Sequence, residues 1–288
     1  MTEVKDPILE SKRTSKYIRF FRIAWIFEVG TVLIAALIHH AEGFSWRLLA
    51  GMGAIAAINM VAYAVNDYFD REVDAKHPSG SKRNPLASGE MSLPEARRLI
   101  IAAAAAALLL SALVSPWAIL TNAIYMVIGL VYVAEPIRLK RRFLLDVASH
   151  IFTVMSYSYL FTVIFFYRFT PLDAFFYVNM VVTSLIVQLS QELFDFDHDR
   201  EFEHNTAIVL GKRGARAVVR IAHAAYFVNT VTAYALGHFP LALFGYVMIF
   251  GVRLYSIFNS THYEKVLALF RLLLLLFTIF LVIRHCAA

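Results

Sequence analysis

Long runs of apolar residues recur along the whole chain, and they limit what it can fold into. Of the 288 residues, 59% are hydrophobic and 17% are charged, whereas about 25% are charged in an ordinary soluble domain. A run of about 20 apolar residues can cross the hydrocarbon core of a bilayer as a helix. Lipid offers no partner to free backbone N–H and C=O groups, so a spanning segment is either a helix or a strand of a closed barrel. The short alternating segments of a barrel are absent from this sequence, which leaves helices. The sequence therefore predicts an all-α polytopic membrane protein.

The apolar runs divide into nine expected spans within one transmembrane domain over 17–288, which follows a polar tail over 1–16. The tail has no apolar core before a small-residue cleavage site, so no cleaved signal peptide is expected. A single cysteine, Cys286, excludes a disulfide within the chain. The expected spans are Tyr17–Ile38, Leu49–Tyr68, Leu99–Val114, Trp117–Ala134, Leu145–Tyr167, Ala174–Phe194, Ala217–Leu236, Pro240–Phe258 and Leu267–Ile283.

Lys and Arg residues gather in the connections on one side of these spans. The tail and the loops 70–98, 136–144, 197–217 and 259–266 carry nineteen of them, and the opposite side carries three. Positively charged loops stay in the cytoplasm. We therefore expect the N-terminus and these loops to be cytoplasmic and the C-terminus external. The net charge of +6 then reflects topology and attraction to anionic lipid, so nucleic acid is not an expected partner.

Two acidic stretches share one spacing. They are "NDYFDREVD", which begins at Asn66, and "ELFDFDHD", which begins at Glu192, and both lie at the ends of apolar spans on the expected cytoplasmic side. The carboxylates of the second lie 125 positions after those of the first. The two trios are Asp67, Asp70 and Asp74, and Glu192, Asp195 and Asp199.

Residues i, i+3 and i+7 of a helix lie within about 60° of arc, so each trio projects from one face. Three carboxylates at the edge of a membrane repel one another unless a cation neutralises them. Oxygen ligands without His or Cys favour a hard cation such as Mg²⁺. The alternative is that each trio forms a solvated acidic rim or caps a helix end. Two observations disfavour this alternative: the trio occurs twice with the same spacing, and acidic residues at a helix C-terminus oppose the helix dipole.

Basic loops accompany both acidic stretches. Carboxylates that hold a metal, with cations opposite, could together bind a diphosphate. For any single Lys or Arg the competing role is to fix the topology. The basic residues that we consider for diphosphate binding are Lys82, Arg83, Arg138 and Lys140.

These residues resemble the signatures of the UbiA superfamily of intramembrane prenyltransferases. Asn66-Asp67-x-x-Asp70-x-x-x-Asp74 is similar to the first signature, and "NPLASGEMS" and "YVAEPIRLK" are similar to the loops of many members. Asp195-x-x-x-Asp199 is similar to the second signature. The chain departs from the pattern at Asn84, where many members have Arg, and at Gln191-Glu192, where many have Asn-Asp.

The resemblance implies nine transmembrane helices around a central cavity, two related four-helix halves and cytoplasmic motif loops. It also implies Mg²⁺-dependent departure of diphosphate from a polyprenyl diphosphate, with two ions expected, and capture of the allylic group by a hydrophobic acceptor in the bilayer.

The resemblance assigns roles to individual residues as well. One metal ion would be bound by Asp67, Asp70 and Asp74, and the other by Glu192, Asp195 and Asp199. Asn66 would orient the first trio, and Tyr132 would line the allylic end. Arg138 and Lys140 would contact the diphosphate, with Lys82 and Arg83 as further binding residues. Two charges in the first span, Arg22 and Glu28, are expected either to pair with each other or to bind the acceptor.

Two other functions stay open at this stage. An intramembrane terpene cyclase of the same superfamily would close the allylic cation on its own chain. A transporter of anionic lipid or a divalent cation is the non-enzymatic alternative. Halves of inverted topology are typical of transporters, whereas here both acidic stretches are expected on the same side of the membrane, as in parallel repeats. Aromatic and quinone precursors, tetrapyrroles, carotenoids and lipids are all acceptors in this superfamily.

Overall fold

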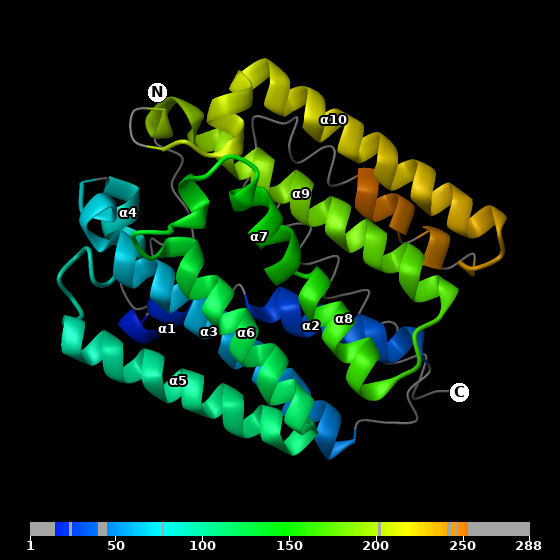
Figure 1. Cartoon of the computed structure of the whole chain (residues 1–288), viewed down its shortest axis with the longest axis horizontal. Helices are drawn as coiled ribbons and strands as arrows, with labels where there is room; N and C mark the ends of the chain where they lie inside the picture. Colours follow the sequence, from blue (N-terminus) through cyan, green and yellow to red (C-terminus); the bar gives the residue numbers. More distant parts are fainter. Residues whose placement is uncertain are drawn as a thin grey trace. The chain divides into compact units, whose positions relative to one another are not determined.

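The computed structural model describes residues 15–22, 25–39, 45–76, 78–200, 203–240, 243–245 and 247–252, and all regular structure in these ranges is helical (Figure 1). The chain forms two compact units. Unit 1 comprises residues 1–29 and 43–138, and unit 2 comprises residues 30–42 and 139–288.

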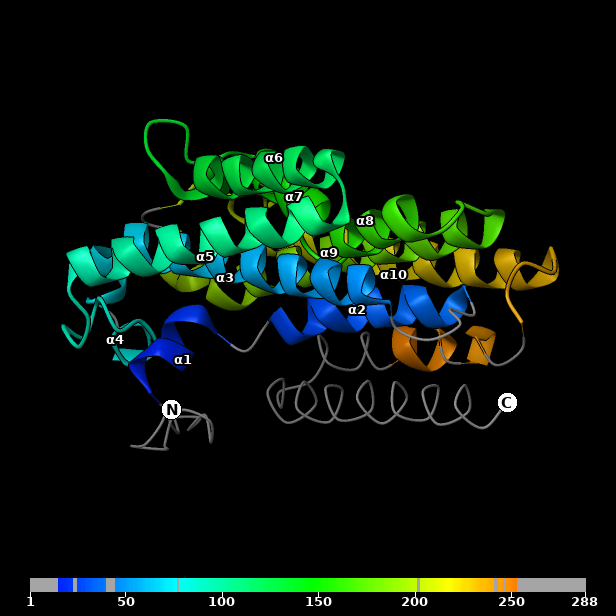
Figure 2. The same cartoon turned by 90° about the horizontal axis from the view of Figure 1, so that it is seen from below.

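Unit 1 is a group of long helices with two short helices at one end. The views of Figures 1 and 2 show α3, α5 and α6 running side by side. Between α3 and α6, Val61, Val65 and Val133 form a buried apolar cluster. The helices of this unit are α1 (Lys16–Phe21), the first residues of α2 (Trp25–Ile38), α3 (Trp46–Asp74), α4 (Pro78–Arg83), α5 (Leu93–Val114) and α6 (Pro116–Val133).

Serine side chains cap the helices of unit 1. Ser45 accepts a hydrogen bond from the backbone N–H of Leu48 at the start of α3, and Ser92 caps α5 in the same way. Ser115 ends α5 and caps α6, with Pro116 as the first residue of α6. Proline suits this position because its missing N–H would have no partner there. The boundary between the expected spans Leu99–Val114 and Trp117–Ala134 therefore lies at Ser115 and Pro116.

Unit 2 is built around α9 and α10, which pack along each other (Figure 1). Its apolar core includes Tyr159, Phe176, Ile186, Leu189 and Tyr226. Further helical residues lie at 243–245 and 247–252. The elements of this unit, with the later part of α2, are η1 (Leu139–Arg141), α7 (Leu145–Thr153), α8 (Ser156–Phe166), α9 (Pro171–Asp199) and α10 (Thr206–Ala235).

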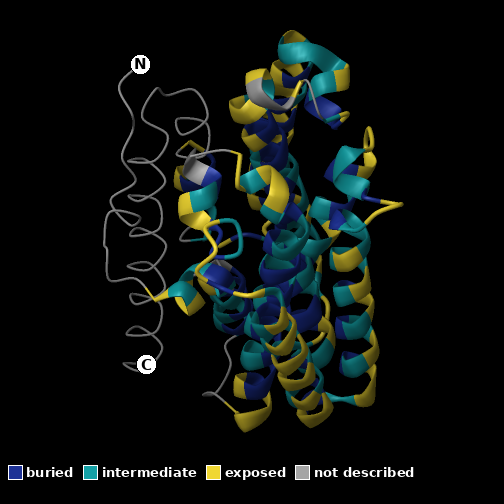
Figure 3. Ribbon diagram, turned by 90° about the vertical axis from the view of Figure 1, so that its left-hand side faces the viewer, coloured by how far each residue is buried: buried dark blue, intermediate teal, exposed yellow. Residues whose placement is uncertain are grey.

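Within the described residues, five helical stretches are long and apolar enough to cross a bilayer. Exposed residues form stripes along several helices (Figure 3). Because many of these residues are large and apolar, a lipid environment accounts for their exposure better than water does. The five stretches are Trp46–Asp74, Leu93–Val114, Pro116–Val133, Leu145–Phe166 and Pro171–Asp197.

Two expected spans are broken in the structure. The span predicted over Tyr17–Ile38 consists of α1 and α2, because Arg22 leaves the helical conformation with a φ of 46°. The span predicted over Leu145–Tyr167 consists of α7 and α8, and Met155 between them has a φ of 50°. The Val154 carbonyl at this second break accepts the hydroxyl of Ser184 at 3.0 Å. A contact distant in sequence therefore accompanies the second break.

The helices that carry the acidic motifs extend further than hydropathy predicted. The spans expected over Leu49–Tyr68 and Ala174–Phe194 continue as α3 to Asp74 and as α9 to Asp199. The ninth expected span, Leu267–Ile283, lies outside the described residues, as do the end of the eighth span and most of the N-terminal tail.

Candidate active site

The first acidic motif lies at the C-terminal end of α3, in unit 1. Because α3 continues without a break to its last residue, Asp67, Asp70 and Asp74 all belong to one helix. Asp67 is fully buried, and Asp70 is 8% exposed. Buried carboxylates in such proximity require positive charge nearby.

Arginines from three different segments supply that charge. One follows α1, one ends α4 and one follows α6, so the motif gathers residues that are far apart in sequence. Such pairs offset the cost of removing each carboxylate from water. The three pairs are Arg22–Asp67, Arg83–Asp74 at 3.2 Å and Arg138–Asp70 at 3.2 Å.

Several buried polar atoms around the motif have unused hydrogen-bonding capacity. Within the described residues, Oδ2 of Asp67 is buried without a hydrogen-bond partner, and so are Nε of Arg22 and Nε of Arg138. Buried polar atoms are nearly always paired in proteins, so each exception calls for an explanation. A carboxylate oxygen can bind a cation, and guanidinium N–H groups can bind an anion.

The chemistry of these donors fits Mg²⁺ when an anionic substrate is present. In the described part of the chain, no three His, Cys, Asp or Glu side chains converge closely enough to hold a metal ion alone. Mg²⁺ is usually held by one or two carboxylates together with waters and phosphate oxygens. The free oxygen of Asp67 and the neighbouring arginine donors match that arrangement. They do not form a site in which protein groups alone surround the metal ion.

Asn84 is a structural member of this site that the sequence reading treated only as a departure. It is fully buried, and its Nδ2 donates to the backbone oxygen of Asp67 at 2.7 Å and to Oδ2 of Asp74 at 2.9 Å. Its Oδ1 accepts the backbone N–H of Leu86 at 3.0 Å. Asparagine before proline often forms such a turn. This local signal in "NPL" could have indicated that Asn84 fixes the loop.

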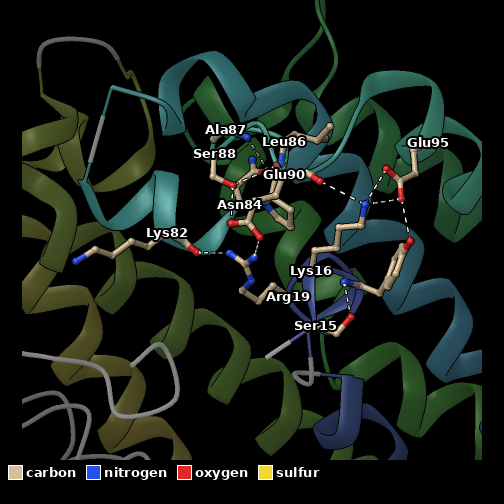
Figure 4. Close-up of polar contacts among 12 residues, drawn as sticks. Ser15, Lys16, Arg19, Lys82, Asn84, Leu86, Ala87, Ser88, Glu90 and Glu95 are labelled. Carbon is tan, nitrogen blue, oxygen red and sulfur yellow. Dashed lines mark hydrogen bonds and ion pairs between the residues drawn. The ribbon is translucent and has the colours of Figure 1, made fainter. Parts of the chain in front are cut away.

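Helix α1 is attached to α4, to the start of α5 and to the loop between them (Figure 4). The Lys16 ammonium lies 2.8 Å from a carboxylate oxygen of Glu95, and the Tyr17 hydroxyl donates to the same carboxylate at 3.0 Å. Arg19 donates to the backbone oxygen of Lys82 at 2.9 Å and pairs with Glu90. These contacts hold α1, and Arg22 directly after it, beside the motif.

The contact between Arg19 and Glu90 depends on the charge of the Glu90 carboxylate. The hydrogen bond from Arg19 is the main cause that lowers the pKa of Glu90, with smaller help from Ser88. A carboxyl whose pKa is lower in the folded protein stabilises the fold above its ordinary pKa. That contribution is lost as the pH falls through the lowered value. We therefore expect the attachment of α1 to weaken below about pH 4, the ordinary range of glutamate.

Arg138 is held toward the motif by its surroundings. Its backbone has a φ of 41°, which residues other than glycine seldom adopt and which persists only when contacts enforce it. Its guanidinium lies 3.2 Å from both Asp70 and Glu135. Tyr132, in the last turn of α6, packs against the cluster of Val61, Val65 and Val133.

The other expected residues of unit 1 occupy varied positions. Asn66 is half-buried on α3, and Glu28 is 2% exposed on α2. Lys82 and Arg83 are exposed, and Figure 4 shows the Lys82 side chain extending away from its backbone contact with Arg19.

The second acidic motif lies at the C-terminal end of α9, in unit 2. Asp195 is exposed, whereas Glu192 is 7% exposed. Both oxygens of Glu192 accept hydrogen bonds, one from Gln188 at 2.7 Å and one from the backbone N–H of Ala207 at 3.0 Å. Asp199 is the last residue of α9, and its side chain lies outside the described part. Glu192 is thus engaged with protein groups on both sides.

Two lysines of unit 2 differ in their surroundings. Lys140 is half-buried in η1. Lys212 pairs with the exposed Asp197 at 2.6 Å. Asp197, which is not one of the three motif positions, is therefore already neutralised by Lys212.

Comparison with known sequences identifies the family. The sequence profile of the UbiA prenyltransferase family matches residues 29–282. The chain therefore belongs to the UbiA prenyltransferase family, whose members are integral membrane enzymes that use isoprenoid substrates. No curated protein matches the chain.

Solved structures share the fold. A UbiA homologue from Archaeoglobus fulgidus bound to GPP and Mg²⁺ has a TM-score of 0.77 at 20% identity, over 95% of this chain and 100% of that chain. The apo structure of a UbiA homologue from Aeropyrum pernix K1 has a TM-score of 0.70 at 19% identity, over 90% and 95%. A structure from work on digeranylgeranylglyceryl phosphate synthase in membranes has a TM-score of 0.64 at 15% identity, over 93% of this chain and 95% of that chain.

Proposed function

We propose that this protein transfers a polyprenyl group from an allylic polyprenyl diphosphate to a hydrophobic acceptor within the membrane and releases diphosphate. The observation that carries this proposal is the environment of Asp67, which is fully buried. It pairs with Arg22 and keeps its second oxygen without a hydrogen-bond partner among the described residues. The fold relatives from Archaeoglobus fulgidus, solved with GPP or DMAPP and Mg²⁺, support the choice of substrate class.

The reaction breaks the bond between the allylic carbon and the diphosphate oxygen. The electron pair of that bond leaves with the diphosphate, the allylic carbon bonds to the acceptor, and the acceptor loses a proton to a base. Bound Mg²⁺ would stabilise the negative charge that develops on the leaving group. Arg138 and Lys140 would bind the same charge, and the unused Nε–H of Arg138 provides a donor for it.

The motif carboxylates would hold the metal, with two ions expected from the two motifs. In the first motif we propose Asp67, Asp70 and Asp74, which must then exchange part of their arginine contacts for metal and diphosphate. In the second we propose Asp195 and Asp199. Asn66 would orient the first group, and Lys82 and Arg83 would attract the diphosphate to it.

The apolar surroundings would protect the allylic group. Tyr132 packs among valine side chains at the end of α6, close in sequence to Arg138. An aromatic face can stabilise a cation, and exclusion of water prevents its hydrolysis. Glu28, buried on α2, is our candidate for contact with the acceptor, whereas Arg22 is already engaged with Asp67.

Pyrophosphate release tests the proposal. Purified protein with Mg²⁺ and farnesyl or geranylgeranyl diphosphate is expected to release pyrophosphate, and faster when an aromatic, quinone-precursor or lipid acceptor is added. Chelation of the metal is expected to stop the release, because the charge on the leaving group then has no counterion. Product analysis by mass spectrometry identifies the acceptor.

The same assay separates the alternatives. A cyclic hydrocarbon formed without acceptor would replace the proposal by a terpene cyclase. No release with any chain length, together with flux of Mg²⁺ or anionic lipid across vesicles, would replace it by a transporter.

Charge asymmetry gives the proposed topology. The loops 70–98, 136–144 and 197–217 would be cytoplasmic, and so would both motifs. A reporter fused after Arg142 is expected to be cytoplasmic and one fused after Ala288 external. Both reporters on one side would refute the odd number of spans that we expect between residues 142 and 288.

A further inference from the structure

A buried carboxylate in unit 2 lies outside both motifs. Asp146, near the start of α7, is fully buried. Its Oδ2 accepts the backbone N–H of Thr206 at 2.5 Å, and its Oδ1 accepts the Thr206 hydroxyl and the backbone N–H of Val147 at 2.7 Å. Three donors on one carboxylate compensate the loss of its hydration. Asp146 therefore joins α7 to the start of α10.

Thr206 is the other half of this junction. Its hydroxyl donates to Asp146 and accepts the backbone N–H of Leu144 at 2.8 Å. Leu144 has a φ of 64°, a conformation that costs energy for a branched side chain and must be enforced by its neighbours. One hydroxyl thus fixes both the turn that leaves η1 and the first residue of α10.

Glu192 completes the same cluster from α9. One of its oxygens accepts the backbone N–H of Ala207, the residue after Thr206, and its carboxyl interacts with that of Asp146. The first N–H groups of a helix have no partners within the helix. At the start of α10, ahead of the break in the helix at Gly211, the N–H groups of Thr206 and Ala207 instead donate to Asp146 and Glu192.

A third contact ties the same two segments together. Nε of Arg141 lies 2.9 Å from a carboxylate oxygen of Glu203. The backbone directly after Lys140 is consequently fastened, at Arg141 and at Leu144, to the residues that precede and begin α10. Asp195 lies one helical turn beyond Glu192 on α9.

We infer that Asp146 and Thr206 are positioning residues that fix Lys140 relative to the acidic end of α9, and that Glu192 belongs to this junction rather than to the metal site. The inference rests on the proposed function, because it concerns how the same site is held. Neither Asp146 nor Thr206 would touch the substrate. Their effect would pass through the backbone of η1 and the first turn of α10.

Substitution of the Thr206 hydroxyl tests the positioning role. Thr206→Val keeps the shape and removes the hydroxyl, whereas Thr206→Ser keeps the hydroxyl. We expect Thr206→Val and Asp146→Asn each to raise the KM for the prenyl diphosphate about tenfold, the scale of one lost hydrogen bond to a charged group, with kcat changed less than about threefold. Thr206→Ser is expected to match the unchanged protein. The double variant is expected to be little worse than either single one, since both remove the same contact.

A matched control separates positioning from stability. Thr230 is also buried in α10, and its hydroxyl bonds to Tyr226 and Asn179. Thr230→Val is expected to lower the unfolding temperature while KM stays unchanged. All kinetics are measured well below the unfolding temperature of each variant. If Thr206→Val and Asp146→Asn lower only the unfolding temperature, as Thr230→Val does, the positioning role is refuted.

Metal binding tests the assignment of Glu192. Mn²⁺ binding, followed by electron paramagnetic resonance with a prenyl diphosphate present, is expected to be unchanged within about twofold in Glu192→Gln and at least about tenfold weaker in Asp195→Asn, which loses a ligand charge. Equal weakening in both variants would make Glu192 a metal ligand and overturn the inference.

The inference and the proposed function fail in different ways. If the unchanged protein releases pyrophosphate and only the variant pattern is wrong, the inference alone falls. If the unchanged protein neither releases pyrophosphate nor binds Mn²⁺, both fall.

Discussion

Asp70→Asn and Asp195→Asn are each expected to slow pyrophosphate release at least ~10²-fold, the effect of deleting one strong electrostatic contact to a transition state. Asp70 is a buried carboxylate that faces Arg138, and Asp195 stands at the equivalent position of the repeated motif. If the two carboxylates act as one catalytic unit, the double variant should lose little more than either single one. The measurement is release rate against Mg²⁺ concentration for each purified variant.

Asp197→Asn is the matched control for this experiment. Asp197 lies two residues from Asp195 on α9, is exposed and already pairs with Lys212. Exposed pairs of this kind contribute little, so the rate should stay within about threefold of the unchanged protein. A loss in Asp197→Asn equal to that in Asp195→Asn would contradict the assignment of the second motif. Normal turnover in folded Asp70→Asn would refute the metal and diphosphate proposal itself.

The membrane helices and the placement of each acidic trio on one helix could be predicted from the sequence, because both follow from local patterns. Helical spacing placed Asp67, Asp70 and Asp74 on one helix, and α3 confirms it. Hydropathy ended that helix too early, at Tyr68, because it counts charged residues as unfavourable. The structure pairs those charges with arginines from other segments, which a window along the sequence cannot detect.

The breaks within two spans could not be predicted for the same reason. Neither Gly nor Pro marks the separation of α7 from α8, and the carbonyl of Val154 accepts hydrogen bonds both from the nearby Ser156 and from Ser184, thirty residues away. Arg22 leaves its helix to reach Asp67, forty-five residues away. Asp146 carries no motif, so its role appears only when the first turn of α10 is seen beside it.

Arg22→Gln is expected to destabilise the protein by about 3 kcal/mol, because it leaves the fully buried Asp67 without its counterion. Arg22 also stacks over the ring of Tyr63 at 5.2 Å, so part of its packing is lost too. Thermal or denaturant unfolding in detergent measures the change. Arg19→Gln is the matched control from the same short segment: its partner Glu90 is half exposed, and the expected cost is below about 1 kcal/mol.

Adding Asp67→Asn to Arg22→Gln separates stability from chemistry. The second change removes the buried charge that the first left unpaired, so the double variant should recover most of the lost unfolding free energy. Pyrophosphate release should not recover, because the free oxygen of Asp67 would no longer carry the charge that holds a metal ion. Recovery of both stability and release would show that Asp67 and Arg22 form only a structural pair, and the metal site would then have to be built without Asp67.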